Sequence, residues 1–235
     1  MFKKITVMIL ATLVSIGSIA QSSNETETES QRQSKALADA VKREFTEIIK
    51  IDTEELLKES LENKTITVMS YNEKNMFIKK FIEDVCAVES KKCPDVYYTT
   101  KENVVAAAMY PTGFMLINEN IHEYLDENAI KFIVAHELGH WFLNHSQEKM
   151  EVASASLVDS GMLVEAEKMV YLLALIPGVV EFQRKVEGQA DQYAFQLLKK
   201  LNLEFNCNTT FEKLLNGKKE YTELHNSFKD RCLLK

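Results

Sequence analysis

Apolar residues recur three or four positions apart along most of the chain, which is the period of a helix that buries one face. The pattern predicts four clear helices, at Ala36 to Asn63, Asn75 to Val88, Glu127 to His145 and Val179 to Leu201. Another helix is predicted from Met150 to Ile176, ending at Pro177 and Gly178 because these residue types interrupt helices. Two short helices are expected between Phe211 and Leu234.

Short runs rich in β-branched and aromatic residues predict four strands, at Thr65 to Tyr71, Val96 to Thr100, Val104 to Tyr110 and Phe114 to Asn118. Pro111 and Gly113 separate the last two strands, and a proline followed by a glycine is typical of a turn. We therefore expect a β-hairpin at this point. The predicted fold is a mostly helical α+β domain with a small sheet beside the Glu127–His145 helix.

The first 20 residues have the pattern of a signal peptide. Lys3 and Lys4 precede an apolar run from Ile5 to Ile16, and Ser18-Ile-Ala20 matches the small-x-small cleavage pattern. An uncleaved anchor is the alternative, although the run is shorter than the about 20 residues of a spanning helix. Residues 21–35 are polar and acidic, which predicts a disordered leader before a folded domain at 36–235.

Four cysteines behind an export signal indicate two disulfides in an oxidising compartment. Of the three pairings, Cys86–Cys93 and Cys207–Cys232 are preferred because each pair is close in sequence. The protein is expected to be exported, and periplasmic if its source is a Gram-negative bacterium.

The formal charge of −7 argues against nucleic acid and anionic lipid as partners, whereas the apolar stretch from Met169 to Val180 leaves a peripheral membrane contact open. Nothing in the sequence indicates an oligomeric state.

The chemistry of the chain is carried by the segment Val134-Ala-His-Glu-Leu-Gly-His140, which contains the H-E-x-x-H pattern inside a predicted helix. His136 and His140 are four residues apart, so both rings lie on one face and can bind one zinc ion. Glu137 is placed to take a proton from a water molecule on that ion. A chance match would bury these polar groups in an apolar helix without partners, which is costly. Gly139, unfavourable inside a helix, suggests that a chain segment or the substrate approaches closely.

A catalytic zinc ion usually has three protein ligands and one open position. Glu187 is the best candidate for the third ligand, and Asp191 lies on the same helix face four residues later. Asp191 can accept the second ring N–H of a histidine ligand and so orient it. The alternative is a solvated acidic helix face, and other acidic residues compete with Glu187 for the role.

The motif His136-Glu-Leu-Gly-His140 with the downstream Glu187-x-x-x-Asp191 resembles the gluzincin metallopeptidases related to HtpX and the CAAX prenyl endopeptidases, which include soluble periplasmic BepA-like proteins. The resemblance covers about Val104 to Arg231 and includes the hairpin that precedes the active-site helix. It implies a zincin-like metallopeptidase domain with one Zn²⁺ per chain, held by His136, His140 and Glu187. It also implies Glu137 as general base and Asp191 as support for a ligand.

Near the C-terminus, His225 and Arg231 resemble the family's H-P-x-x-x-x-R segment, except that Asn226 replaces the proline. The resemblance implies that both side chains lie near the metal. There they could stabilise the oxyanion of peptide hydrolysis, or His225 could block the open metal position. The alternative for both is simple solvation. His145, His122 and Trp141 are interpreted as structural, and an exposed edge of the hairpin is a candidate site for an extended substrate.

Three functions are consistent with these residues. The preferred one is a zinc-dependent endopeptidase that cleaves unfolded or misassembled cell-envelope proteins. The second is a chaperone-like protein that binds clients and has a self-blocked zinc site. The third is a zinc hydrolase of non-peptide substrates, since metal-activated water is not specific for peptides.

Overall fold

The computed structural model describes residues 29–64, 66–68, 76–99, 106–149, 151–152, 177–210 and 232. Its helices and strands follow the order α2 (Glu29–Glu62), β1 (Ile66–Val68), α3 (Met76–Glu89), β2 (Asp95–Thr99), β3 (Ala107–Met109), β4 (Phe114–Asn118), α4 (Ile121–Tyr124), α5 (Glu127–Phe142) and α8 (Pro177–Lys200). The predicted signal peptide, most of the predicted Met150–Ile176 helix and the two C-terminal helices lie outside the described residues. The prediction of a mostly helical fold with a small sheet is confirmed.

The strands form one sheet in the order β1-β2-β4-β3. β4, which has the predicted bounds, lies in the interior of the sheet, pairs in parallel with β2 and forms an antiparallel hairpin with β3. The hairpin turn is closed by hydrogen bonds between Tyr110 and Phe114 and between Gly113 and Tyr110. Gly113 has a φ of 92°, a conformation that favours glycine, so the predicted turn is confirmed.

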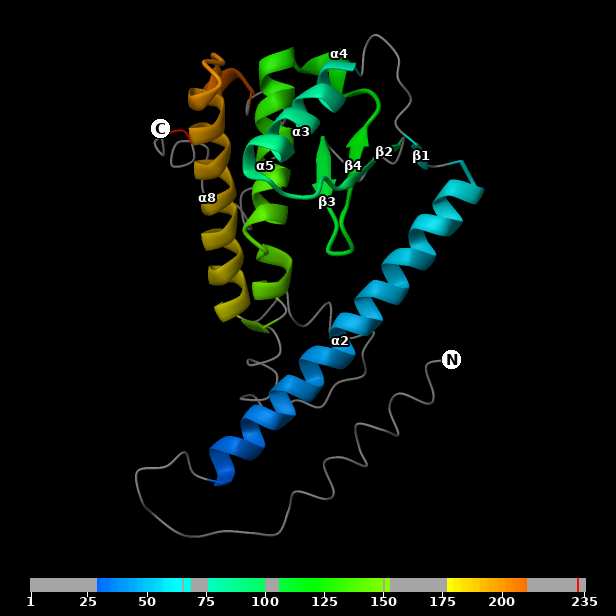
Figure 1. Cartoon of the computed structure of the whole chain (residues 1–235), viewed down its shortest axis with the longest axis vertical. Coiled ribbons are helices and arrows are strands. Elements are labelled where there is room, and N and C mark those ends of the chain that lie inside the picture. Colours follow the sequence, from blue (N-terminus) through cyan, green and yellow to red (C-terminus); the bar gives the residue numbers. More distant parts are fainter. Residues whose placement is uncertain are drawn as a thin grey trace.

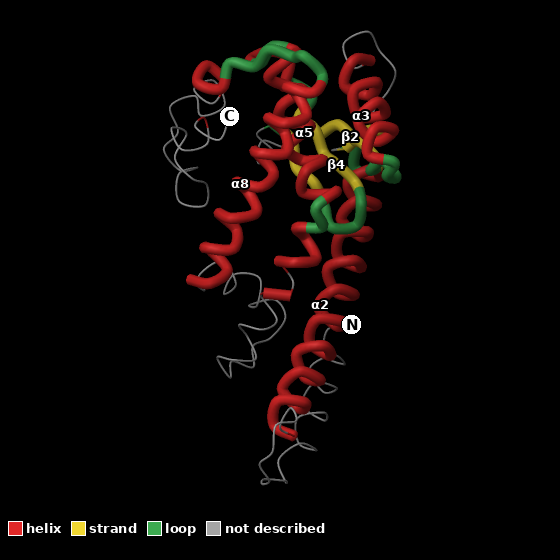
Figure 2. The backbone as a smooth tube through the Cα atoms, turned by 60° about the vertical axis from the view of Figure 1, so that its left-hand side comes forward, coloured by secondary structure: helices red, strands yellow, loops and turns green. Residues whose placement is uncertain are grey.

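Side chains of β4 alternate between two cores, because successive residues of a strand point to opposite faces. Met115 and Ile117 pack into the main core with α3 and α5, whereas Phe114 and Leu116 join a smaller cluster that includes Leu57 of α2. Figures 1 and 2 show the sheet next to α5, with α8 alongside α5 on its other side. The sheet and α8 therefore enclose α5, the helix that carries the H-E-x-x-H motif.

The first helix is longer than the sequence predicted. α2 begins at Glu29 rather than Ala36, so the last part of the predicted disordered leader, residues 29–35, is helical. Gln, Arg and Lys have good helix propensity, and Glu29 favours the positive end of the helix dipole, which accounts for the early start. Figure 1 shows α2 extending away from the sheet, and Lys42 in its middle forms an ion pair with Glu151.

The two helices of the candidate site differ from prediction only at their ends. Asp126 caps α5 by accepting a 2.9 Å hydrogen bond from Ala129 N. α5 ends at Phe142 instead of His145, because Asn144 adopts a left-handed φ of 57°. α8 begins at Pro177, which was predicted to end the preceding helix; proline is suited to a first helical turn because its missing N–H is not needed there.

Both preferred disulfides form, Cys86–Cys93 with a Cα–Cα distance of 5.5 Å and Cys207–Cys232 with 5.7 Å. The one-turn helix α4 was not predicted, and His122 lies in it rather than in a connecting turn. Within the part of the chain that the structure describes, no helix is both long and apolar enough to cross a membrane.

Candidate metal centre

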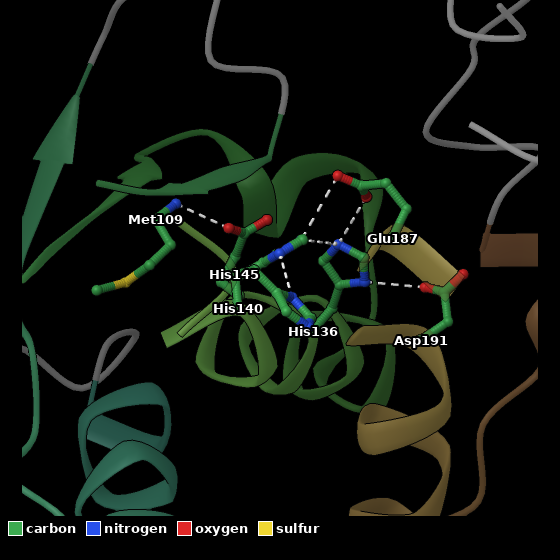
Figure 3. A network of polar contacts seen from close by, with 7 residues as sticks. Met109, His136, His140, His145, Glu187 and Asp191 are labelled. Carbon is green, nitrogen blue, oxygen red and sulfur yellow. Dashed lines mark hydrogen bonds and ion pairs between the residues drawn. The ribbon is translucent and has the colours of Figure 1, made fainter. Parts of the chain in front are cut away.

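Three side chains from two helices converge on one point (Figure 3). His136 Nε2 lies 3.1 Å from His140 Nε2 and 3.2 Å from Glu187 Oε2, and His140 Nε2 lies 3.5 Å from Glu187 Oε1. Ligands about 2.0–2.1 Å from a tetrahedral zinc ion would be about 3.3 Å apart. The observed separations are close to this spacing, with a different oxygen of Glu187 nearest to each histidine.

The surroundings and chemistry of these three groups also suit a metal ion. His136 is buried, and the side chains of His140 and Glu187 are only 15% and 12% exposed. Two imidazoles and one carboxylate are a donor set that zinc accepts while keeping a fourth position open. The residues therefore fit a zinc ion, as predicted for His136, His140 and Glu187 together.

The close approach of α5 and α8 depends on Gly139. A Cβ atom at this position would lie 3.2 Å from Ala190 Cα and 3.1 Å from Tyr193 Cδ1. Carbon atoms prefer separations of about 3.5–4.0 Å, so any larger residue would push the helices apart. Of the two explanations considered for this glycine, the structure supports close approach by a chain segment, namely α8.

The outer ring nitrogen of His136 is held by a carboxylate, as the sequence predicted for Asp191. His136 Nδ1 lies 2.9 Å from Asp191 Oδ1, and Asp191 is fully buried. Burial lowers the pKa of His136, but hydrogen bonds with Asp191 and Glu187 outweigh it and raise the pKa to about 10 in the metal-free protein. A metal ion that binds His136 must therefore displace a proton.

The outer nitrogen of His140 is held by a residue that the sequence analysis missed as part of the site. His140 Nδ1 lies 2.9 Å from Nδ1 of His145, which is 3% exposed. Burial and the neighbouring His140 lower the pKa of His145 to about 4, so its ring is neutral near pH 7 and can accept a hydrogen bond. Helical spacing gave no signal for this contact, because His145 follows a turn at Asn144.

Glu137 lies beside this cluster and contacts the sheet. Its Oε2 accepts a 2.7 Å hydrogen bond from the backbone N–H of Met109 in β3. Burial raises the pKa of Glu137, and the adjacent His136 and His140 partly oppose this. A carboxyl group whose pKa is raised above its ordinary value accepts and returns protons more readily near neutral pH.

Comparison with known proteins identifies the family. Residues 72–231 match the model of peptidase family M48. The chain belongs to peptidase family M48. It is 26% identical over 128 residues to the metalloprotease LoiP of Escherichia coli K12 and 30% identical over 114 residues to the metalloprotease YcaL of the same organism.

These alignments cover 51% and 45% of the chain, and 50% and 43% of LoiP and YcaL. The M48 chain thus spans about half the length, or less, of these curated relatives. Among solved structures it is similar to Ste24p of S. mikatae, with a TM-score of 0.45 and 15% identity, over 97% of this chain and 66% of that one.

Two residues predicted to lie near the metal in this M48 chain, His225 and Arg231, lie outside the described residues. Trp141 packs against Gly113 of the hairpin turn and donates a 3.2 Å hydrogen bond to Lys92 O. The ring of His122 contacts Phe77 edge-on, with 5.7 Å between centroids. The interpretation of Trp141 as a packing residue is therefore supported, and His122 is outside the ligand cluster.

Proposed function

We propose that this M48 chain is a zinc-dependent endopeptidase, with His136, His140 and Glu187 as metal ligands and Glu137 as general base. The observation that carries this proposal is the convergence of two imidazole nitrogens and the Glu187 carboxylate on one point, with Glu137 beside them. When bound, zinc supplies Lewis acidity and lowers the pKa of water.

Several residues of the chain have separate roles in the proposed reaction. Glu137 takes a proton from the attacking water at its carboxylate and passes it to the leaving amine. Met109 N–H holds one oxygen of this carboxylate, and the other oxygen would take the proton. Asp191 orients His136 through Nδ1. His225 and Arg231 are proposed to stabilise the oxyanion, with blockage of the open position by His225 as the alternative.

Strand β3 is a suitable docking edge for an extended peptide. It is an edge strand of the sheet. Hydrogen bonds from Asn118 N to Ala106 O and from Tyr110 N to Phe114 O show that Ala106 and Tyr110 face β4. By alternation, the backbone groups of Ala107 and Met109 face away from β4. Because Glu137 already accepts from Met109 N–H, a docked peptide would pair with Ala107 and with the Met109 carbonyl. A peptide paired with this edge would pass Glu137, and main-chain pairing gives affinity with little sequence preference.

Unfolded or misassembled cell-envelope proteins are the proposed substrates, because an unfolded segment readily presents an extended backbone to an edge strand. Two disulfides are typical of an oxidising compartment and support export. The N-terminal signal pattern supports the same location, which would be the periplasm in a Gram-negative bacterium. A BepA-like role in envelope quality control is consistent with these features.

The test is Glu137→Gln, with Glu127→Gln as matched control. Both are glutamates of α5, but Glu127 is exposed and ion-paired with Lys131 at the far end of the helix. Cleavage of casein should fall by about 10²–10⁴-fold in the first variant, with zinc still bound, and stay unchanged in the second. Full casein cleavage by Glu137→Gln would contradict the proposal, and retained client binding without any wild-type cleavage would favour the chaperone-like alternative.

A further inference from the structure

The two candidate histidine ligands are supported on their outer sides by different chemical groups. Asp191, a buried carboxylate, contacts Nδ1 of His136. His145, another imidazole, contacts Nδ1 of His140. The first contact follows from the expected metal site, whereas nothing in the motif requires the second.

The positions of the hydrogen atoms follow from the geometry around His140. Its Nε2 faces His136 and Glu187, so Nε2 is the atom that would bind the ion. A ring that ligates through Nε2 keeps its proton on Nδ1. At 2.9 Å from this N–H, Nδ1 of His145 must be the acceptor, and the proton of His145 is then on Nε2.

A second residue completes this arrangement. Gln189 on α8 is near enough for its side chain to act on the ring of His145 and raise the pKa of that ring. Because Nδ1 of His145 is already used by His140, a hydrogen bond with Gln189 would run from the remaining Nε2–H to the amide oxygen. A ring that is only 3% exposed requires such partners, since burying unpaired polar atoms is costly.

We propose that His145 and Gln189 are positioning residues that fix the tautomer and orientation of the zinc ligand His140. The turn at Asn144, with a φ of 57°, brings His145 back against the ring of His140, with 5.0 Å between the two centroids. Gln189 lies two residues after Glu187, so one short segment of α8 supplies both a proposed ligand and the end of this chain. This inference rests on the proposed zinc site.

The role of His145 as a hydrogen-bond acceptor is testable with two substitutions. His145→Phe keeps an aromatic ring, although a larger one, and has no acceptor, whereas His145→Asn offers an amide oxygen close to the position of Nδ1. Outer partners of metal ligands typically contribute about 10–100-fold to metal affinity. We expect His145→Phe to weaken zinc binding by this factor in a chelator competition assay, and His145→Asn to restore it to within a few-fold of wild type.

The controls separate this effect from folding and from catalysis. His122→Phe removes an imidazole that packs on Phe77, outside the ligand cluster, and should leave zinc affinity unchanged. Gln189 is exposed, so Gln189→Ala should fold normally and weaken zinc binding a few-fold. This variant decides the question if His145→Phe does not fold. The Co²⁺ absorption spectrum reports ligand geometry without any substrate.

Wild-type zinc affinity in both His145→Phe and Gln189→Ala would overturn the proposal. Equal losses of zinc affinity in His145→Phe and His145→Asn would also overturn it, because an acceptor at this position would then contribute nothing to zinc binding. If the wild-type protein itself binds no zinc, the proposed function fails as well. If it binds zinc but does not cleave casein, only the catalytic proposal fails and the positioning role is still measured.

Discussion

Replacing Gly139 by alanine tests whether close packing of α5 on α8 holds the candidate metal centre together. The added Cβ would lie 3.2 Å from Ala190 Cα, a backbone atom that cannot rotate away. Reaching an ordinary carbon contact of about 3.5–4.0 Å requires α8 to move by roughly half an ångström. Glu187 and Asp191 flank Ala190 on that helix, so both would move with it.

Two energy terms of opposite sign apply to Gly139→Ala. Alanine in a helix interior is favoured over glycine by about 1 kcal/mol. Overpacking a close contact costs about 1–3 kcal/mol. The free energy of unfolding of the metal-free protein should therefore fall by about 0–2 kcal/mol. Zinc affinity should also fall, by about tenfold or more, because a metal site tolerates only about 0.5 Å of displacement of its ligands.

Urea unfolding of the metal-free protein and zinc competition with a chelator measure the two effects separately. The expected result is a small change in stability together with a large loss of zinc affinity. An increase in stability of about 1 kcal/mol with unchanged zinc affinity would refute the reasoning, because the helix propensity term alone would then describe the variant.

Three further outcomes are expected. Asp191→Asn should weaken zinc binding by about 10–100-fold, whereas the capping variant Asp126→Ala should lower stability by about 1 kcal/mol without changing zinc affinity; similar zinc affinity in Asp191→Asn and wild type would contradict this. Chelation should lower the melting temperature, since free zinc at 100 times its Kd contributes about 2.7 kcal/mol. Because the pKa of His136 is about 10 in the metal-free folded protein and about 6.5 when unfolded, its stabilising effect is complete below pH 6.5 and is lost as the pH rises through 10. A flat melting profile between these pH values would count against the His136–Asp191 contact.

Much of the fold could be predicted because local patterns determine it. Phe114–Asn118 has its predicted bounds, and the helix of the motif begins at Glu127 as expected, one residue after its cap. Element ends were less predictable, because they depend on single-residue backbone conformations. The stop at Phe142 follows from the left-handed Asn144, and Pro177 begins a helix rather than ending one.

Some residues of the candidate site could be predicted from local patterns, and others could not. His136 and His140 follow from helical spacing alone, since residues four apart share a face. His145 could not be found by that argument, because it contacts His140 from beyond the end of the helix. The identity of its partner Gln189 depends on how α8 packs, which no local pattern contains.

The register between α5 and α8 explains why the Glu187 and Asp191 carboxylates reach the histidines together. Ala190 contacts Gly139, which places Glu187 near the two Nε2 atoms and Asp191 near His136 Nδ1. A slip of α8 by one residue would rotate both carboxylates by about 100° around the helix axis and leave the histidines without partners. The H-E-x-x-H motif therefore supplies two ligands, but the small residues at positions 139 and 190 determine whether the third ligand, the carboxylate of Glu187, can reach the two histidines.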